Sequence, residues 1–219
     1  MAPLLALGTL GLVGPALTTA LARVWGRPSL WLLGIELEVR GEENLRHPGS
    51  RIVVANHQSA LDMPIFAAIC PTAPLVLAKS ELRWVFPFNL MWMALGQRFV
   101  DRGDAGAARR SVARLVRALK RRERSVVLSP EGTRSRTGHL GPFKMGAFHM
   151  AVETGAPIVP VCFLHPGRLM PPGRWWAEAG RVVIEVHPPI PTAGWSADRV
   201  HQYADALRGD YQRWLGEGE

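Results

Sequence analysis

Short apolar runs alternate with helical stretches along most of the chain, and this alternation constrains the fold more than any other feature. Runs typical of buried strands lie at 51–55, 74–78, 98–100, 125–128, 158–164 and 181–187. Helical patterns lie at 62–69, at 104–122 and at 143–154, where Gly155 ends the helix, and Ser196 caps a last helix. Strands that alternate with helices favour a layered α/β domain. We therefore expect a mixed, largely parallel sheet flanked by helices.

The expected helix at 104–122 carries most of the net charge. The 219 residues have a formal net charge of +8, and residues 98–124 alone contain ten basic and three acidic side chains. Apolar residues recur along one side of this helix with the period of an α-helix, and arginines fill the other side. Such a basic surface attracts phosphates, anionic lipid or nucleic acid, but it is also typical of an ordinary solvated helix face.

The beginning of the chain suggests attachment to a membrane. Residues 2–22 contain no charge, and about 20 apolar residues suffice to cross a bilayer. Arg23 and Arg27 follow, and positive charge at this position predicts that the rest of the chain stays on the cytoplasmic side. Trp25 and Trp31 favour the membrane interface. We expect residues 1–35 to form an apolar, membrane-associated helical segment and residues 36–219 to form a separate domain.

Two other interpretations of this segment stay open. Residues 20–22 resemble a signal-peptide cleavage site, although a basic region before the apolar run is missing. A hairpin that enters the membrane from one side is also compatible with the sequence, with a break near Gly14-Pro15 and residues 29–35 as its second apolar piece. The sequence does not distinguish a helix that spans the bilayer from one that lies on its surface.

A possible catalytic pair lies where the strand at 51–55 meets the following helix. Residues 56–62 read Asn-His-Gln-Ser-Ala-Leu-Asp. In α/β proteins, the ends of strands commonly hold ligands and catalytic groups. A carboxylate at Asp62 can hold one ring nitrogen of His57 and leave the other free to take a proton. The spacing by itself is also compatible with a structural histidine near a helix start.

An arginine after the expected strand at 98–100 is a candidate for binding phosphate. It ends the segment Gly-Gln-Arg-Phe-Val-Asp-Arg at 96–102. Arg102 can hold a phosphate through two parallel hydrogen bonds, or it can form a surface pair with Asp101. The sequence leaves both possibilities open.

The loop after the strand at 125–128 offers further binding groups. Its glycine and proline allow the backbone to approach a ligand closely, and Glu131, Thr133 and Arg134 add an acceptor, a hydroxyl and a cation. An ordinary polar turn has the same composition. Farther along, residues 156–161 read Ala-Pro-Ile-Val-Pro-Val, which is typical of a strand bounded by prolines.

Taken in order, these four segments resemble the glycerophospholipid acyltransferases of the PlsC type. That family carries NHxxxxD, GxxFxDR, PEGTR and a hydrophobic block bounded by prolines, which read here NHQSALD, GQRFVDR, PEGTRSR and APIVPV. The stretch FKMGAF at 143–148 is similar to the family's FKxGAF. The likeness covers about residues 35–190, and four ordered blocks are far more specific than one. Arg98 and Ser129 depart from the family, which often has a hydrophobic residue and a phenylalanine there.

The resemblance implies a reaction. A fatty acyl group would pass from acyl-CoA or acyl carrier protein to the free hydroxyl of 1-acyl-sn-glycerol-3-phosphate, which gives phosphatidic acid. His57 would be the general base, and Asp62 would orient it. The substrate-binding residues implied by the family are Arg102, Glu131, Gly132, Thr133, Arg134 and Lys144. Acyl transfer from a thioester needs no metal, and no cofactor is expected besides the acyl donor.

The resemblance also implies partners and a location. The partners would be a lysophospholipid, the acyl donor and a membrane surface with anionic lipid, at the cytoplasmic face of the cell membrane. Residues 36–219 would be the catalytic domain, and Trp175 and Trp176 are a second candidate for interfacial contact. Other acceptors stay open: glycerol-3-phosphate, another lysophospholipid or a lyso-aminolipid. A non-catalytic basic membrane-binding module is an alternative, whereas nucleic acid is not expected because no known nucleic-acid-binding motif is present.

Overall fold

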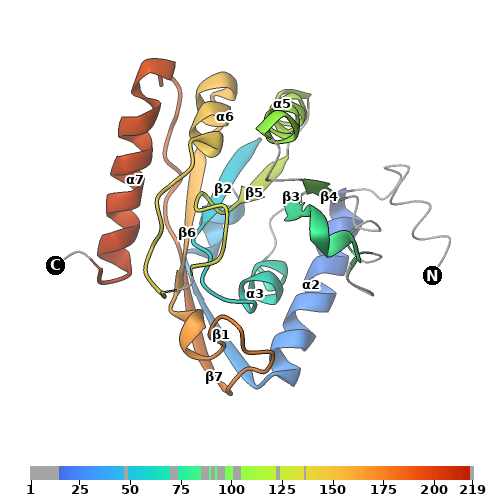
Figure 1. Cartoon of the computed structure of the whole chain (residues 1–219). Coiled ribbons are helices and arrows are strands. Elements are labelled where there is room, and N and C mark those ends of the chain that lie inside the picture. Colours follow the sequence, from blue (N-terminus) through green and yellow to red (C-terminus); the bar gives the residue numbers. More distant parts are fainter. Residues whose placement is uncertain are drawn as a thin grey trace.

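The computed structural model describes residues 15–46, 49–69, 74–84, 89, 92, 97–100, 105–121, 124–135 and 137–217, and within them seven strands form one sheet (Figure 1). The strands are β1 (Ile35–Arg40), β2 (Arg51–Ala55), β3 (Pro74–Lys79), β4 (Arg98–Val100), β5 (Ser125–Leu128), β6 (Ile158–Leu164) and β7 (Gly180–Val186). Their order across the sheet is β1-β7-β6-β2-β5-β3-β4. Neighbouring strands are parallel except β6 and β7. The predicted mixed, largely parallel α/β sheet is confirmed.

Helices cover both faces of this sheet. The α-helices are α2 (Pro15–Leu32), α3 (Asp62–Ala68), α5 (Ala105–Arg121), α6 (Gly146–Thr154) and α7 (Val200–Trp214). Short 3-10 helices are η1 (Glu42–Arg46), η2 (Ser80–Trp84), η3 (Pro166–Arg168) and η4 (Ala197–Arg199). Helices α5, α6 and α7 lie on one face of the sheet, and α2 and α3 lie on the other (Figure 1).

The central strand β2 contributes side chains to two hydrophobic cores. Ile52 and Val54 pack with α5, α6 and α7, whereas Val53 and Ala55 pack with α2 and α3. Successive side chains of a strand point to opposite faces, so an uninterrupted apolar run is typical of a strand covered on both sides. All residues of β2 are buried. The strand is therefore a rigid base for the residues that follow it.

Helix α2 is continuous and packs closely on α3. Its described part runs from Pro15 through Pro28 to Leu32. The alternative with a second apolar piece at 29–35 does not match the structure there, since residues 29–32 are the last turn of this helix. Gly26 allows the close approach: a Cβ there would lie 2.4 Å from the backbone nitrogen of Ala68.

The predicted N-terminal segment is described only from Pro15 onward. Residues 2–14 of the uncharged run, including Gly14 of the suggested break, lie outside the described residues. In the part of the chain that is described, no helix is both long and apolar enough to cross a bilayer. The division of the chain at residue 35 stays a prediction.

One strand and two helix starts differ from the sequence-based expectation. Residues 35–40 alternate apolar and charged side chains, which is typical of a half-exposed strand, and they form the unexpected strand β1 beside β7. Helix α6 starts at Gly146, three residues later than expected, and ends as predicted at Gly155, whose φ of 67° is left-handed. Ser196 precedes η4 and makes no capping hydrogen bond through its side chain, so it does not cap α7.

Candidate active site

The candidate catalytic loop leaves the sheet at Asn56, directly after β2. The side-chain Nδ2 of Asn56 donates to the carbonyl oxygen of Phe163 at 3.0 Å, and the backbone N–H of Phe163 donates to Asn56 Oδ1 at 2.7 Å. The Asn56 side chain thus extends the pairing of β2 with β6 by one more residue. Because the Asn56 side chain is buried and makes two hydrogen bonds, the starting point of the loop is fixed.

His57 and Asp62 form the predicted pair. His57 Nδ1 lies 2.7 Å from Asp62 Oδ2, and the same oxygen accepts the backbone N–H groups of Gln58 at 2.8 Å and Ser59 at 2.9 Å. The Asp62 side chain is 5% exposed, whereas that of His57 is 32% exposed. A carboxylate at Nδ1 favours the tautomer that carries its proton there, which leaves Nε2 as the basic nitrogen. The pair can therefore accept a proton from a molecule that reaches the exposed ring.

Glu131 joins the loop after β5 to the catalytic loop. Its Oε1 accepts the backbone N–H of His57 at 2.8 Å, and its Oε2 accepts the backbone N–H of Gly141 at 3.0 Å. The backbone N–H of Ser135 donates to the carbonyl oxygen of His57 at 2.8 Å. Burial raises the pKa of Glu131, and the hydrogen bonds from Gly141 and His57 act in the opposite direction.

Gly132 and Lys144 lie against each other beside this contact. Gly132 has a φ of +74°, and a Cβ there would lie 2.7 Å from Lys144 Nζ. The backbone N–H of Lys144 donates to the carbonyl oxygen of Pro130 at 2.7 Å, although the residue as a whole is exposed. A side chain at position 132 would displace the ammonium group, so glycine serves both the turn and the close approach.

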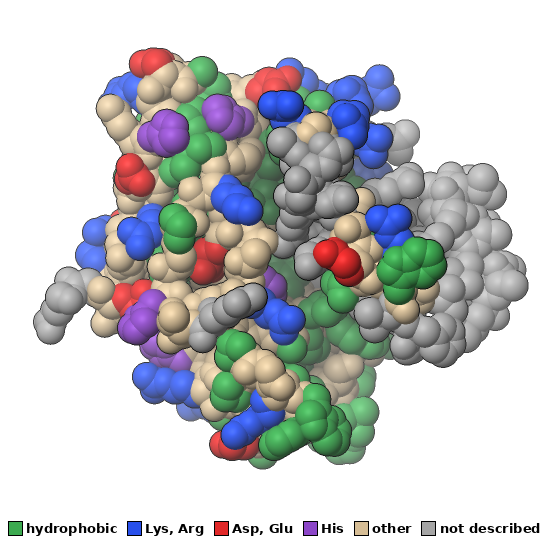
Figure 2. Space-filling model, viewed as in Figure 1, with side chains coloured by type: hydrophobic (Ala, Val, Ile, Leu, Met, Phe, Trp, Pro, Cys, Tyr) green, Lys and Arg blue, Asp and Glu red, His purple; other side chains and the backbone are tan. Residues whose placement is uncertain are grey.

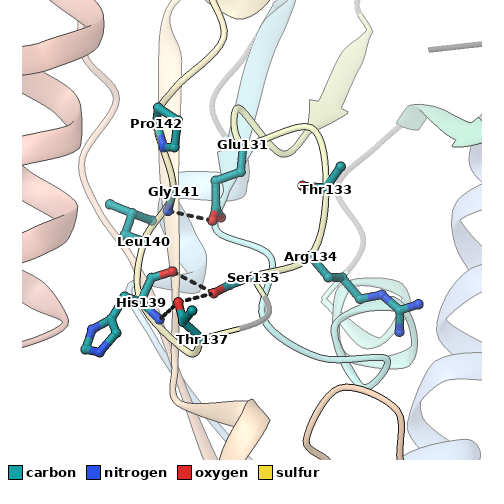
Figure 3. Close-up of a pocket in the computed structure, with 9 residues that line it drawn as sticks. All are labelled: Glu131, Thr133, Arg134, Ser135, Thr137, His139, Leu140, Gly141 and Pro142. Carbon is teal, nitrogen blue, oxygen red and sulfur yellow. Dashed lines mark hydrogen bonds between the residues drawn. The ribbon is translucent and has the colours of Figure 1, made fainter. Parts of the chain in front are cut away.

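The loop after β5 also borders a cavity of about 450 Å³. The lining residues are Glu131, Thr133, Arg134, Ser135, Thr137, His139, Leu140, Gly141 and Pro142. Figure 3 shows Glu131 pointing across the loop to Gly141, whereas the side chain of Arg134 extends away from Glu131. Thr133 and Arg134 are exposed, so both can meet a ligand from solvent.

The structure unites only part of the predicted site by direct contact. His57, Asp62 and Glu131 are linked by hydrogen bonds, and Lys144 lies over Gly132. Arg102 lies outside the described residues, so its position relative to His57 stays a prediction. Among the described residues, no three His, Cys, Asp or Glu side chains are grouped to hold a metal ion. That the reaction needs no metal stays a prediction.

The backbone groups that hold the site together leave no signal in the sequence. Ser135 and Gly141 act through their N–H groups, which every residue except proline possesses, so no residue pattern indicates them. Gln58 lies in the first block, but the pattern assigns its side chain no role. Its Nε2 donates to the carbonyl oxygen of Gly138 at 3.0 Å and adds another link between the two loops.

Known proteins are similar to this chain in both sequence and fold. The family model described as Acyltransferase matches residues 36–164, which is more than half of the chain. The 1-acyl-sn-glycerol-3-phosphate acyltransferase of Salmonella typhimurium is 32% identical over 186 residues, which cover 85% of this chain and 75% of that protein. The 1-acyl-sn-glycerol-3-phosphate acyltransferase alpha of Bos taurus is 35% identical over 178 residues, covering 81% of this chain and 62% of that protein.

A crystal structure extends the likeness to three dimensions. The 1-acyl-sn-glycerophosphate (LPA) acyltransferase PlsC from Thermotoga maritima matches with a TM-score of 0.74 at 30% identity, over 91% of this chain and 78% of that chain. The matching family model, the relatives and the shared fold thus define an enzyme of acyl transfer. The chain belongs to the acyltransferase family, and within it to the PlsC type whose four blocks the sequence carries.

Proposed function

We propose that this enzyme transfers a fatty acyl group from a thioester to the free hydroxyl of 1-acyl-sn-glycerol-3-phosphate and so forms phosphatidic acid. The observation that carries the proposal is the hydrogen bond between His57 Nδ1 and Asp62 Oδ2 at the carboxyl end of β2. This pair supplies the base that removal of a hydroxyl proton requires. The names of the relatives described above support the choice of acceptor.

In the proposed reaction, His57 acts as a general base and then as a general acid. Its Nε2 takes the proton of the acceptor hydroxyl while that oxygen attacks the thioester carbonyl. The tetrahedral intermediate collapses, the C–S bond breaks, and the proton passes from Nε2 to the departing thiolate. Asp62 holds the Nδ1 proton and stabilises the transient imidazolium. A positioned base of this kind contributes about 10²- to 10⁴-fold in rate.

We place the phosphate of the acceptor at the cationic groups beside the cavity. Thr133 and Arg134 offer a hydroxyl and a guanidinium at its edge, and the ammonium of Lys144 lies next to Gly132. Arg102 is proposed as a further phosphate ligand, as the family pattern implies. Two arginines suit a dianion because each can donate two parallel hydrogen bonds. Arg102→Ala and Arg134→Ala are each expected to raise the KM for the acceptor more than they lower kcat.

The acyl donor is proposed to be acyl-CoA or acyl carrier protein, with no resident cofactor or metal. Both donors present the same thioester to the attacking oxygen, so His57 serves either one. Parallel assays with each donor, with and without a chelator, test both statements. Activity that the chelator abolishes and that one divalent cation restores would contradict the metal-free reaction.

The decisive experiment compares two histidines. Wild type, His57→Ala and His201→Ala are purified in detergent and given labelled acyl-CoA with lysophosphatidic acid. His201 is exposed on α7, on the opposite face of the sheet from α3, and is the matched control. We expect phosphatidic acid from wild type and His201→Ala, and a loss of at least about 100-fold for His57→Ala.

Circular dichroism of the three proteins provides the folding control. Undiminished turnover by a folded His57→Ala protein would remove His57 as the base. A wild type that is inactive with lysophosphatidic acid and both donors, but active with glycerol-3-phosphate or another lysophospholipid, would change the acceptor and leave the mechanism intact.

We also propose that α2 attaches the enzyme to the cytoplasmic surface of the cell membrane. Large apolar side chains are exposed along one side of this helix: Leu17, Leu21, Val24, Trp31 and Leu32. Trp175 and Trp176 are also exposed, on the segment between η3 and β7. Figure 2 shows hydrophobic side chains gathered low on the molecule, where Figure 1 places the end of α2. An apolar surface rich in tryptophan suits the membrane interface.

Vesicle flotation tests this attachment. Trp31→Ser with Leu32→Ser is expected to reduce binding to vesicles, while His201→Ser with Ala206→Ser on the exposed side of α7 leaves it unchanged. The anionic component is tested by Arg27→Gln, an exposed arginine of α2 itself. This change is expected to weaken binding to anionic vesicles by about 1 kcal/mol and to leave zwitterionic vesicles unaffected. Equal flotation of all variants would contradict the proposed surface.

A further inference from the structure

Both oxygens of the Glu131 carboxylate accept hydrogen bonds from the protein backbone. Glu131 is 7% exposed, and its two oxygens accept the backbone N–H groups of His57 and Gly141 at 2.8 and 3.0 Å. Gly141 leaves room for this contact, because a Cβ there would lie 3.3 Å from Glu131 Oε2. The family pattern implies that this residue binds substrate, whereas its contacts lead to the main chain of the catalytic histidine.

The main chain of His57 is held on both sides by the loop after β5. Its N–H donates to Glu131, and its carbonyl oxygen accepts the N–H of Ser135 at 2.8 Å. The next residue, Gln58, donates from its side chain to Gly138 in the same loop. The imidazole is held separately by Asp62. Two different carboxylates thus contact His57, Asp62 at the ring and Glu131 at the main chain.

We propose that Glu131 is a positioning residue that fixes the main chain of His57, and through it the imidazole, and that it is not a ligand of the acceptor. The inference rests on the proposed role of His57 as the base. The N–H groups of His57 and Gly141 point at the two terminal atoms of the Glu131 side chain, so both of these atoms must accept a hydrogen bond. Among side chains of this length, only a carboxylate has two terminal acceptor oxygens. Glutamine would accept one N–H group and turn its own N–H group toward the other.

Kinetics separate positioning from binding. The variant is Glu131→Gln, and the matched control is Glu153→Gln, an exposed residue of α6. With lysophosphatidic acid varied, Glu131→Gln is expected to lower kcat about 10- to 100-fold, because small displacements of a catalytic group are costly. Its KM is expected to stay within about threefold of wild type, and Glu153→Gln to match wild type in both constants. A raised KM with unchanged kcat would overturn the proposal.

Hydrogen exchange provides the readout that a merely structural role would not give. In wild type, the amides of His57 and Gly141 should both be protected, and in Glu131→Gln one of them should exchange faster while amides in β2 do not change. Faster exchange throughout the sheet would mean general destabilisation and would overturn the positioning role. Unprotected amides at both positions in wild type would also overturn it.

Two further arms keep the test decisive. If Glu131→Gln does not fold, Glu131→Asp is used, whose carboxylate is one methylene shorter and reaches only one of the two amides. It should lower kcat in the same way without raising KM. His57→Ala is assayed in parallel: if it keeps the activity of wild type, the proposed base is wrong, whereas the exchange of the His57 amide in wild type still decides the contact with Glu131.

Discussion

The two faces of the sheet differ in what their helices present on the outside. On α7, the exposed side chains are His201, Gln202, Asp205, Ala206 and Arg213. On α2, the exposed side chains that the structure describes are Ala16, Leu17, Ala20, Leu21, Val24, Arg27, Pro28, Trp31 and Leu32. Both helices bury one side in the protein, so the difference lies entirely in their outer sides.

This difference is the one that the proposed membrane attachment of α2 requires. A polar outer side is typical of a helix that faces water, whereas a helix that is apolar nearly all round is typical of burial or of contact with lipid. The His57–Asp62 pair lies beside the apolar layer, since Asp62 is the first residue of α3 and α3 packs on α2. A lipid acceptor arriving from a membrane at α2 would therefore approach the layer that carries the proposed base.

The largest expected effect tests whether catalysis belongs to the α2–α3 layer. Asp62→Asn keeps an oxygen that can accept the hydrogen bonds now made to Oδ2, but it removes the charge that stabilises the imidazolium of His57. We expect kcat to fall about 10²- to 10⁴-fold with the fold preserved. Asp205→Asn, an exposed change on α7, is the control and should leave kcat unchanged. An Asp62→Asn protein with a kcat near that of wild type would contradict the assignment.

A pair of glycine substitutions compares the packing of the two layers. Gly26→Ala places a Cβ within 2.7 Å of three backbone atoms of α3, so we expect it to lower the free energy of unfolding by about 3 kcal/mol. Gly209→Ala lies inside α7, where the nearest atom to the new Cβ is 3.8 Å away. It is expected to raise the free energy of unfolding by about 0.5–1 kcal/mol, since alanine favours helix. Chemical denaturation in detergent measures the free energy of unfolding of both variants. Equal changes would show that the surroundings of Gly26 and Gly209 are packed equally closely.

A buried tyrosine tests how the α7 layer supports the site. The Tyr211 hydroxyl accepts the N–H of Val161 at 3.0 Å and donates to the carbonyl oxygen of Val54 at 2.7 Å, so it is inserted between β6 and β2 just before Asn56. Tyr211→Phe leaves both backbone groups without this partner, and we expect a loss of about 1–2 kcal/mol in the free energy of unfolding. Tyr203→Phe is the control, because its hydroxyl makes only a 3.3 Å contact with the N–H of Ser196.

Thiol labelling gives an independent measure of the same variant. Burial raises the pKa of Cys162, next to Val161 in β6, to about 12, so the native thiol should react slowly with alkylating reagents. Tyr211→Phe should increase the labelling rate of Cys162, and Tyr203→Phe should not. Identical rates in the three proteins would show that the hydroxyl does not hold the strands together.

The smallest expected effect concerns the pH dependence of stability at the α7 layer. His187 stacks on Trp214 with ring centroids 3.5 Å apart, and burial lowers the pKa of His187, although Glu185 and Asp210 act to raise it. Because the folded-state pKa is depressed, the contribution of neutral His187 is present above its ordinary pKa and is lost as the pH falls through the folded-state value. Wild type should therefore lose stability between about pH 7.5 and pH 5.5 more steeply than His187→Phe. Parallel unfolding curves at the two pH values would contradict this.

The elements of this fold were predictable wherever a pattern is local. Apolar runs indicated β2, β5 and β6, and the period of the apolar side indicated α5 and α7. The alternating strand β1 was not predicted, because its pattern follows directly on that of an apolar helix. Its pairing with β7 depends on contacts between opposite ends of the chain, which no local pattern contains.

The site divides in the same way. His57 and Asp62 are five positions apart, so one loop and the first turn of α3 bring them together. Their spacing offered a candidate pair, and the ordered family blocks made it specific. The partner of the His57 main chain is 74 positions away, at Glu131. The sequence showed that Glu131 carries a carboxylate in a turn, but only the parallel pairing of β2 with β5 decides that this turn meets the catalytic loop.

The sequence alone therefore determined the α/β class and the resemblance to a family of acyltransferases, and it indicated His57 and Asp62 as a candidate pair, because these depend on neighbouring residues and on ordered blocks. Tertiary structure decided that the carboxylate of Glu131 contacts the main chain of His57, and which side of α2 is exposed. Those properties depend on burial and on hydrogen bonds between distant segments, and such contacts exist only once the sheet has formed.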